Sequence, residues 1–208
     1  MKRRSKGALQ REHVTWMPMT DMLSSTLMIT FLFIAVSTLL RAMNAKPPII
    51  RLEDTEDYRF NTGSFAVSPN FTNVLVKSAI PKIEKTIKCY GIDTIEIVGH
   101  TDGRPGVAGG NIDITLANAF KTKDTSQIIP GSNMDLGFLR AMAVQNKIGN
   151  ILSSRGIDNI GFRVLSAGST IDIDGKFLPA ENKDEKSRRR IEIRFLRRSE
   201  APFIPKCT

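Results

Sequence analysis

The chain has 208 residues, which is enough for one globular domain with an appendage. Apolar residues make up 41% and charged residues 25%, a composition that excludes wholesale disorder. Two cysteines are too few for a disulfide-built scaffold, and with two histidines they leave little material for a structural zinc site. The net charge of +9 favours an acidic partner such as nucleic acid, anionic lipid or another anionic polymer.

An apolar segment over 16–40 is typical of a transmembrane helix. From Met22 to Leu40 it holds no charged residue, and it reaches the ~20 residues that a helix needs to cross ~30 Å of hydrocarbon. Trp16 lies where interfacial aromatic residues are common. The segment is longer than the apolar part of a signal peptide, and no A-x-A site follows Leu40, which favours an uncleaved anchor.

The tail over 1–15 predicts the topology. It carries one acidic residue against five basic ones: Lys2, Arg3, Arg4, Lys6 and Arg11. Basic residues beside a membrane helix stay on the cytoplasmic side. We therefore expect a single-pass membrane protein with a cytoplasmic N-terminus and with everything after Arg41 on the far side of the membrane. In a Gram-negative bacterium the membrane would be the inner membrane and the far side would be the periplasm.

Asp21 is the one charged residue of the apolar segment. A carboxylate in such a span costs a few kcal/mol and usually marks an ion path or a partner contact. Asp21 shares a helix face with Ser24, Ser25 and Met28, where small side chains permit close helix packing and burial would let the carboxylate gain and lose a proton. The residues alone leave a second reading open, in which Asp21 caps the helix at the cytoplasmic interface.

The rest of the chain is expected to form a linker, one soluble domain over 58–197 and a tail over 198–208. The linker over 41–57 contains Pro47–Pro48 and mixed charge. A helix over 68–91 is predicted from Ser68 as its N-cap and Pro69 as its first residue, with a division at Pro81.

The domain combines further strands with one more helix. The second helix is predicted over Met134–Gly156, ending at a C-cap glycine, and residues 105–131 form an irregular insertion. Strands are predicted at four places: 59–67, Thr94–Val98, Ile160–Leu165 and Ile191–Leu196. Strands alternating with helices predict an α/β (α+β) fold with helices packed on a mixed sheet.

Four fragments of this domain resemble, in order, the motifs of the OmpA-like peptidoglycan-binding domain. They are FNTGSFAV at 60–67, VGHTDGRPG at 98–106, SNMDLGFLRAMAV at 132–144 and DEKSRRRIEIRF at 184–195. The family pattern runs through a G-H-T-D strand end, an N-x-x-L-S-x-x-R-A helix start and a closing N-R-R strand. The combination is specific, whereas G-H-T-D alone is a weak signal.

The resemblance implies that Asp102 and Arg140 hold the diaminopimelate residue of a peptidoglycan stem peptide, and that Asn133 and Leu136 line the pocket. Diaminopimelate carries a free amine and a carboxylate, and arginine forms bidentate, charge-assisted pairs with carboxylates. The start of the helix also offers free backbone N–H groups. Without the resemblance, Asp102 would be read as a turn cap and Arg140 as the partner of a surface carboxylate.

Two other kinds of site are disfavoured. A metal site at His100 and Asp102 has little support, because a lone histidine at a strand end is more often a hydrogen-bonding anchor. The run Ser187–Arg190 lacks the interleaved aromatic residues of a nucleic-acid patch and would lie outside the cytoplasm. We therefore expect no metal, no cofactor and no nucleic-acid partner.

The chain departs from the family pattern in two places. Gly137 stands where serine is usual, and the insertion over 105–131 separates Asp102 from Asn133 more widely than the family does. The insertion leaves three readings open, since it could be a lid, a dimer contact or a specificity loop.

The order of basic tail, membrane helix with an early Asp, linker and OmpA-like domain is similar to the MotB class of stator subunits. The W-x-P-x-x-D segment from Trp16 to Asp21 looks like the part that holds the ion-carrying Asp in this class and in its ExbD/TolR relatives. The short linker, brief N-terminus and large insertion make the chain more similar to the ZorB family, the cell-wall-anchored subunits of the Zorya anti-phage defence system.

This resemblance implies that Asp21 binds a proton or sodium ion in a homodimeric two-helix core. The core would lie inside a ring, expected to be pentameric, of a polytopic MotA/ZorA-like membrane subunit. No nucleophile–base constellation suggests a hydrolase, so we do not expect an enzyme. Two alternatives stay open: a passive peptidoglycan-anchoring protein, and a flagellar or gliding motility stator.

Overall fold

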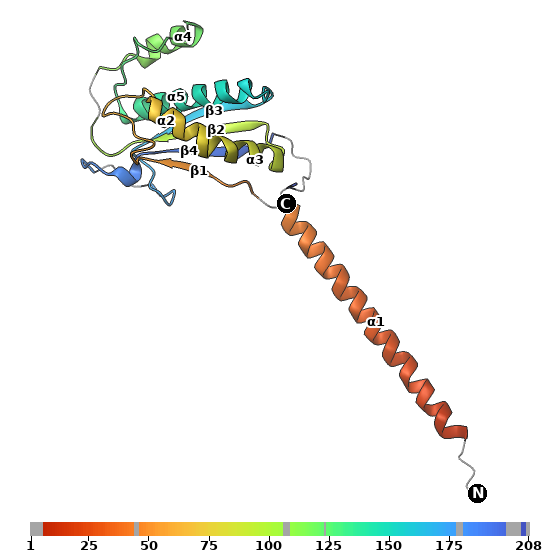
Figure 1. The fold of residues 1–208 in the computed structure, drawn as a ribbon. Coiled ribbons are helices and arrows are strands. Elements are labelled where there is room, and N and C mark those ends of the chain that lie inside the picture. The colour runs from red at the N-terminus through yellow and green to blue at the C-terminus, as the bar shows by residue number, and fades with distance from the viewer. Residues whose placement is uncertain are drawn as a thin grey trace. The chain divides into compact units, whose positions relative to one another are not determined.

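The computed structural model describes residues 6–43, 46–105, 109–122, 124–177, 181–198 and 205–206. The chain divides into two compact units, Met1–Ala45 and Lys46–Thr208. The first unit contains the helix α1, and the second contains the sheet and the helices α2 to α5 (Figure 1). Most of the tail expected over 198–208 lies outside the described residues.

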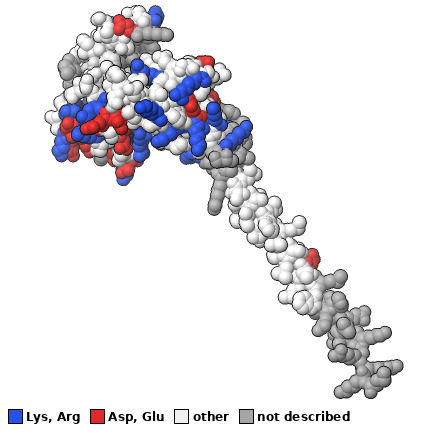
Figure 2. All heavy atoms as spheres, in the orientation of Figure 1, with Lys and Arg blue, Asp and Glu red and all other residues white. Residues whose placement is uncertain are grey.

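Helix α1 (Lys6–Met43) is continuous and contains the predicted apolar segment. Its part Pro18–Leu40 has 23 residues and a mean hydropathy of 2.1, so it is long and apolar enough to span a membrane. The sequence of this part contains one acidic residue, Asp21, and Figure 2 shows the described side chains of the helix as almost entirely uncharged. The helix begins before the predicted start at residue 16 and ends beyond residue 40.

Several hydroxyl groups of α1 are hydrogen-bonded inside the helix. Thr26 Oγ1 donates to the backbone oxygen of Met22 at 3.0 Å, and Thr30 Oγ1 donates to that of Thr26 at 2.7 Å. Ser24 Oγ donates to the backbone oxygen of Asp21 at 3.0 Å. Such bonds satisfy the hydroxyls locally, so these side chains are compatible with an apolar environment.

The second unit is built on a four-stranded sheet in the order β1-β4-β2-β3. The strands are β1 (Ile50–Glu53), β2 (Thr94–His100), β3 (Gly161–Gly168) and β4 (Arg190–Leu196). β2 runs parallel to β3 and antiparallel to β4, and β1 pairs with β4 in antiparallel fashion. The predicted fold class, helices packed on a mixed sheet, is confirmed.

One face of the sheet packs against α2 (Pro69–Val74), α3 (Ile80–Tyr90) and α5 (Asn133–Ser154), which lie on the same side in Figure 1. Alternate strand residues, including Ile95, Ile97 and Ile193, are fully buried there and share one apolar core with residues of all three helices. Apolar burial of about 25 cal/mol per Å² is the main force that holds these layers together.

The opposite face of the sheet carries paired charges. Glu192 accepts hydrogen bonds from Arg190 Nε at 2.9 Å and from Arg194 Nη2 at 2.7 Å. Glu96 Oε2 on β2 lies 3.6 Å from Arg163 Nη1 on β3. Because Arg190 and Glu192 are buried, removing one partner would leave an uncompensated buried charge.

The helix predicted over 68–91 is present and is divided as expected. Ser68 Oγ accepts the backbone N–H of Phe71 at 3.1 Å, and Pro69 is the first helical residue. A π-helical segment, Leu75–Ala79, separates α2 from α3, and Pro81 is the second residue of α3. Proline has no N–H to donate, so the regular hydrogen-bond ladder is interrupted where the sequence predicts it.

Three segments differ from the sequence prediction. The expected linker over 41–57 contains β1, because Leu52 is buried in the core and fastens an edge strand to β4. Residues 59–67, predicted as a strand, form an irregular segment with a turn at Gly63, where φ is +67°. The insertion contains α4 (Ile112–Thr122), whose apolar residues are spaced by one helical turn.

Helix α4 belongs to a small second core on α5. Ala119 and Ile128 of the insertion are buried against Leu139 and Met142 of α5. The Gly-rich and polar ends of the insertion hide this apolar pattern in the sequence. The insertion is therefore docked on the domain over its described residues.

The end of the chain lies beside α3. The backbone N–H of Lys206 donates to the backbone oxygen of Cys89 at 2.8 Å. Cys89 is disulfide-bonded, and the other cysteine of the sequence, Cys207, lies outside the described residues.

Candidate functional site

The four residues that the sequence analysis assigned to peptidoglycan line one cleft of the second unit. The cleft has a volume of about 510 Å³, and its lining includes Asp102, Asn133, Leu136 and Arg140. Asp102 follows the end of β2, and the other three lie on the first turns of α5. The cleft is thus formed where the end of a strand meets the start of a helix.

Two glycines permit this meeting of β2 and α5. A Cβ atom on Gly99 would lie 1.9 Å from the backbone oxygen of Gly137, and one on Gly137 would lie 2.4 Å from Ser166 Oγ. The strand and the helix are therefore in backbone contact. This contact accounts for Gly137 at the position where the OmpA-like pattern has serine.

The first residues of α5 are fixed by local hydrogen bonds. Ser132 Oγ accepts the backbone N–H of Asp135 at 3.1 Å, which caps the helix. Asn133 Nδ2 donates to the backbone oxygen of Arg104 at 2.7 Å. The segment after β2 and the start of α5 are thus in direct contact, although the insertion separates them in the sequence.

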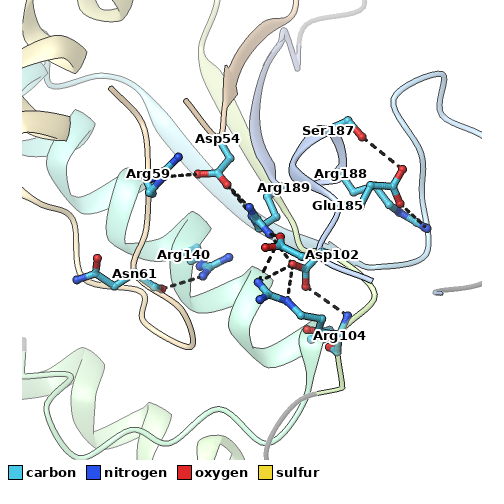
Figure 3. Close-up of polar contacts among 12 residues, drawn as sticks. Asp54, Arg59, Asn61, Asp102, Arg104, Arg140, Glu185, Ser187, Arg188 and Arg189 are labelled. Atoms are coloured by element: carbon cyan, nitrogen blue, oxygen red, sulfur yellow. Dashed lines mark hydrogen bonds and ion pairs between the residues drawn. The ribbon is translucent and has the colours of Figure 1, made fainter. Parts of the chain in front are cut away.

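Asp102 is buried and is paired within the protein. Its Oδ2 accepts hydrogen bonds from Arg104 Nε at 2.9 Å and from Arg189 Nη1 at 2.6 Å (Figure 3). Among the described residues, Oδ1 accepts only the backbone N–H of Arg104, at 3.3 Å. Oδ1 therefore keeps acceptor capacity for a ligand.

Arg189 connects Asp102 with two further carboxylates. Its Nε donates to Asp54 Oδ2 at 2.6 Å, and its Nη1 also pairs with Asp184. Burial acts to lower the pKa of Arg189, but the hydrogen bonds that it donates to Asp184, Asp102 and Asp54 outweigh this effect and raise the pKa above its ordinary value. Arg189 is therefore charged and orients the Asp102 side chain.

Arg140 binds a loop rather than a carboxylate. Its Nε donates to the backbone oxygen of Ser64 at 2.9 Å and its Nη2 to that of Asn61 at 3.3 Å, as Figure 3 shows for Asn61. The guanidinium carbon lies 5.0 Å from the centre of the Phe60 ring. These contacts hold part of the irregular segment 59–67 against α5.

Arg140 stays charged at neutral pH although it is only 5% exposed. Burial, followed by the charge of Arg189, lowers the pKa of Arg140 to about 10. Nη1 of Arg140 makes no hydrogen bond to a described residue. This nitrogen is therefore available to an anionic group in the cleft.

The cleft has an excess of positive charge. It is lined by three acidic residues, Asp54, Asp102 and Asp184, and by five basic ones, Arg59, Arg104, Arg140, Lys186 and Arg189. With every acidic residue paired, two positive charges are in excess, and this favours a ligand that carries carboxylates.

Sequence reasoning found Asp102 and Arg140 but missed most of their charged neighbours. Asp54 lies in the segment expected as a linker, and Asp184 lies before β4, far from the other motifs in the sequence. Arg104 follows Asp102 by two residues, and this proximity was the one local signal that could have found it. Asp184 and Arg189 lie in the fragment 184–195 that carries the resemblance, but only the strand order of the sheet brings this fragment and Asp54 beside Asp102.

His100 is buried beside the ion pairs of the sheet, with Nε2 3.7 Å from Glu192 Oε1. Burial, followed by the charge of Arg190, lowers the pKa of His100 to about 4, so the ring is neutral at pH 7. Among the residues that the structure describes, no three His, Cys, Asp or Glu side chains are grouped so as to hold a metal ion.

Comparison with solved structures finds similar folds. The periplasmic domain of Helicobacter pylori MotB is 20% identical, with 74% of this chain and 78% of that chain covered and a TM-score of 0.46. A MotB-like protein from Desulfovibrio vulgaris is 17% identical, with 72% and 75% covered and a TM-score of 0.45. The cell wall anchor of the T6SS from Pseudomonas aeruginosa is 20% identical, with 72% and 81% covered and a TM-score of 0.39.

No model of a protein family and no curated protein matches the chain. TM-scores below 0.5 carry no argument about function. The functional conclusion therefore depends on the residues of the cleft and of α1.

Proposed function

We propose that this chain is a membrane-anchored subunit that binds peptidoglycan through the cleft between β2 and α5. The observation that carries the proposal is that Asp102 and Arg140, buried and oppositely charged, line the same cleft without being paired to each other. A zwitterionic group fits between two such charges. Diaminopimelate of a stem peptide has that group in its free amine and carboxylate.

We infer the position of each end of the ligand from the hydrogen-bonding capacity of the two side chains. The ammonium group is placed at Oδ1 of Asp102, because Oδ2 holds Arg104 and Arg189. The carboxylate is placed at Nη1 of Arg140, because Nε and Nη2 hold the loop carbonyls. Asn133 and Leu136 would then contact the chain between the two ends.

Co-sedimentation of the full chain with purified sacculi that contain diaminopimelate tests the proposal. Arg140→Ala should reduce the bound fraction at least several-fold, because the ligand carboxylate loses its partner. Arg140→Lys should also bind less, since lysine cannot make the forked contact. Arg163→Ala is the matched control, because Arg163 lies on the charged face of the sheet. Equal binding of all four proteins would contradict the site.

We further propose that the chain is a MotB-like subunit of an ion-driven motor complex, with Asp21 as the ion carrier. Asp21 is exposed on α1 within an apolar segment, and the hydroxyls of Ser24 and Thr26 are hydrogen-bonded to the helix backbone. In this arrangement two copies of α1 pack within a ring of a polytopic MotA/ZorA-like subunit in the bacterial inner membrane. Recovery of a complex with one copy of this chain would contradict the dimer.

The finer proposal is that the complex is a Zorya-type anti-phage defence system, with this chain in the ZorB role. It is supported by the sequence resemblance, in particular the large insertion over 105–131. Asp21→Asn should assemble normally and abolish phage protection, because asparagine cannot ionise. Full protection with normal assembly would leave a passive peptidoglycan anchor as the better account, whereas loss of motility in place of protection would indicate a flagellar or gliding stator.

A further inference from the structure

The insertion supplies one wall of the cleft. Ile129 and Pro130 line the cleft together with Asn133 and Leu136. Ile128, the residue before this wall, is 5% exposed in the small core on α5, whereas Ile129 is 54% exposed. The chain thus places one isoleucine in the core as an anchor and presents the next one to the cleft.

The wall is held in place by three hydrogen bonds of Asn111, at the base of the insertion. Asn111 Oδ1 accepts the backbone N–H of Ile129 at 2.7 Å, and Asn111 Nδ2 donates to the backbone oxygen of Gln127 at 2.9 Å. The backbone N–H of Asn111 donates to the backbone oxygen of Ile129 at 3.1 Å. One side chain and its own backbone therefore fix the two residues that flank Ile128.

Two glycines, Gly110 and Gly131, let the two ends of the insertion approach each other closely. A Cβ atom on Gly110 would lie 2.4 Å from the backbone nitrogen of Gly131. The segments that enter and leave the insertion are therefore in backbone contact. The N–H of Gly131 donates to Asp135 Oδ2 at 2.9 Å on the first turn of α5. The apolar wall is therefore built onto the same helix start that carries Asn133 and Leu136.

The size and lining of the cleft indicate what the wall contacts. A volume of about 510 Å³ lies in the range of small-molecule sites, ~300–1,000 Å³, and is larger than one diamino acid needs. The charged side chains account for the amine and carboxylate ends of that residue. A half-exposed isoleucine beside a proline offers no hydrogen-bond donor from its side chains, so it suits an alkyl group.

We propose that the Ile129–Pro130 wall is a specificity element that contacts the alkyl side chain of the residue next to diaminopimelate in the stem peptide, such as the methyl group of an alanine. This inference depends on the proposed peptidoglycan site. It selects one of the three roles that the sequence left open for the insertion, the specificity loop. The wall acts on the neighbour of the diamino acid and the charged pair acts on the diamino acid itself.

The test compares two ligands, a disaccharide tetrapeptide with meso-diaminopimelate and the free amino acid meso-diaminopimelate. Binding to the full chain in detergent micelles is measured by calorimetry. Ile129→Ser should weaken binding of the tetrapeptide about five-fold, the effect of losing contact with half an isoleucine side chain. Binding of free diaminopimelate should be unchanged.

The matched control is Ile114→Ser. Ile114 is 84% exposed on α4 and does not line the cleft, so its replacement should change neither affinity. Both isoleucines are exposed, and equal unfolding temperatures would show that the fold is retained.

The outcomes distinguish a failure of the proposed role of the Ile129–Pro130 wall from a failure of the proposed peptidoglycan site. If Ile129→Ser binds the tetrapeptide with wild-type affinity while Arg140→Ala loses affinity, the proposed role of the Ile129–Pro130 wall is wrong and the proposed function stands. Equal losses for both ligands in Ile129→Ser would also overturn this role of the wall. If Arg140→Ala binds both ligands as the wild type does, the peptidoglycan site itself fails.

Discussion

At the scale of single residues, the site depends on the backbone contact between Gly99 and Gly137. A methyl group on Gly99 would meet the backbone oxygen of Gly137 at 1.9 Å, and neither β2 nor α5 can move without disturbing the core. We expect Gly99→Ala to reduce the free energy of unfolding by about 3 kcal/mol, as overpacking does in a rigid interior. Chemical denaturation followed by circular dichroism measures the change.

Gly149→Ala is the control for this prediction. Gly149 lies on α5, the helix that Gly99 contacts. A Cβ atom on Gly149 would make ordinary contacts, the nearest at 3.6 Å to Gln145 Nε2. Alanine in place of glycine inside a helix stabilises by about 0.5–1 kcal/mol. Equal destabilisation by the two substitutions would contradict the close approach of β2 and α5.

His100 gives the folded domain a dependence on pH. Its pKa in the folded chain is about 4, below the ordinary value of 6.5, because burial and the charge of Arg190 disfavour the imidazolium. Between pH 6.5 and pH 4 the unfolded chain therefore binds a proton that the folded chain does not, and stability falls as the pH falls. Above pH 6.5 this contribution is complete.

His100→Gln should flatten this dependence, because glutamine does not titrate. Thermal unfolding at pH 7 and at pH 5 should show a smaller loss of unfolding temperature for the variant than for the wild type. Arg190, Glu192 and Arg194 face His100 and are present in both proteins, so the difference between the two profiles isolates the histidine. Parallel profiles would contradict the neutral, buried imidazole.

At the scale of elements, the first turn of α5 holds Asn133 and Leu136 of the site, and the N-cap of this turn can be tested alone. Ser132→Ala should reduce the free energy of unfolding by about 1 kcal/mol, because the N–H of Asp135 loses its acceptor. Ser132→Asp keeps a capping oxygen and should be close to the wild type. Urea unfolding of the three proteins measures this, and equal stability of Ser132→Ala and the wild type would contradict the cap.

The elements also show what the sequence can predict. Ser68 marks the start of its helix in the sequence because a cap is a local interaction, and the apolar alternation of β2 and β4 is likewise local. β1 is not predictable in the same way, because its four residues follow two prolines and are held by pairing with distant β4. Residues 59–67 are likewise held by hydrogen bonds from Arg140, which is distant in the sequence and gives no local signal there.

At the scale of the whole molecule, the candidate site was predictable only in outline. Asp102, Asn133, Leu136 and Arg140 follow from two motifs, and the structure places all four on one cleft. The network of Asp54, Arg104 and Arg189 requires the sheet to bring three separated segments together. The wall at Ile129 requires the insertion to fold back onto α5.

We propose that the stem peptide binds in the cleft between β2 and α5. The most direct test is a titration of the isotope-labelled full chain in micelles with the meso-diaminopimelate tetrapeptide, followed residue by residue by NMR. We expect the largest chemical-shift changes at Asp102, Asn133, Leu136 and Arg140, including the side-chain Nε–H of Arg140. Changes confined to the charged face of the sheet, at Arg163, Glu192 and Arg194, would contradict this proposal.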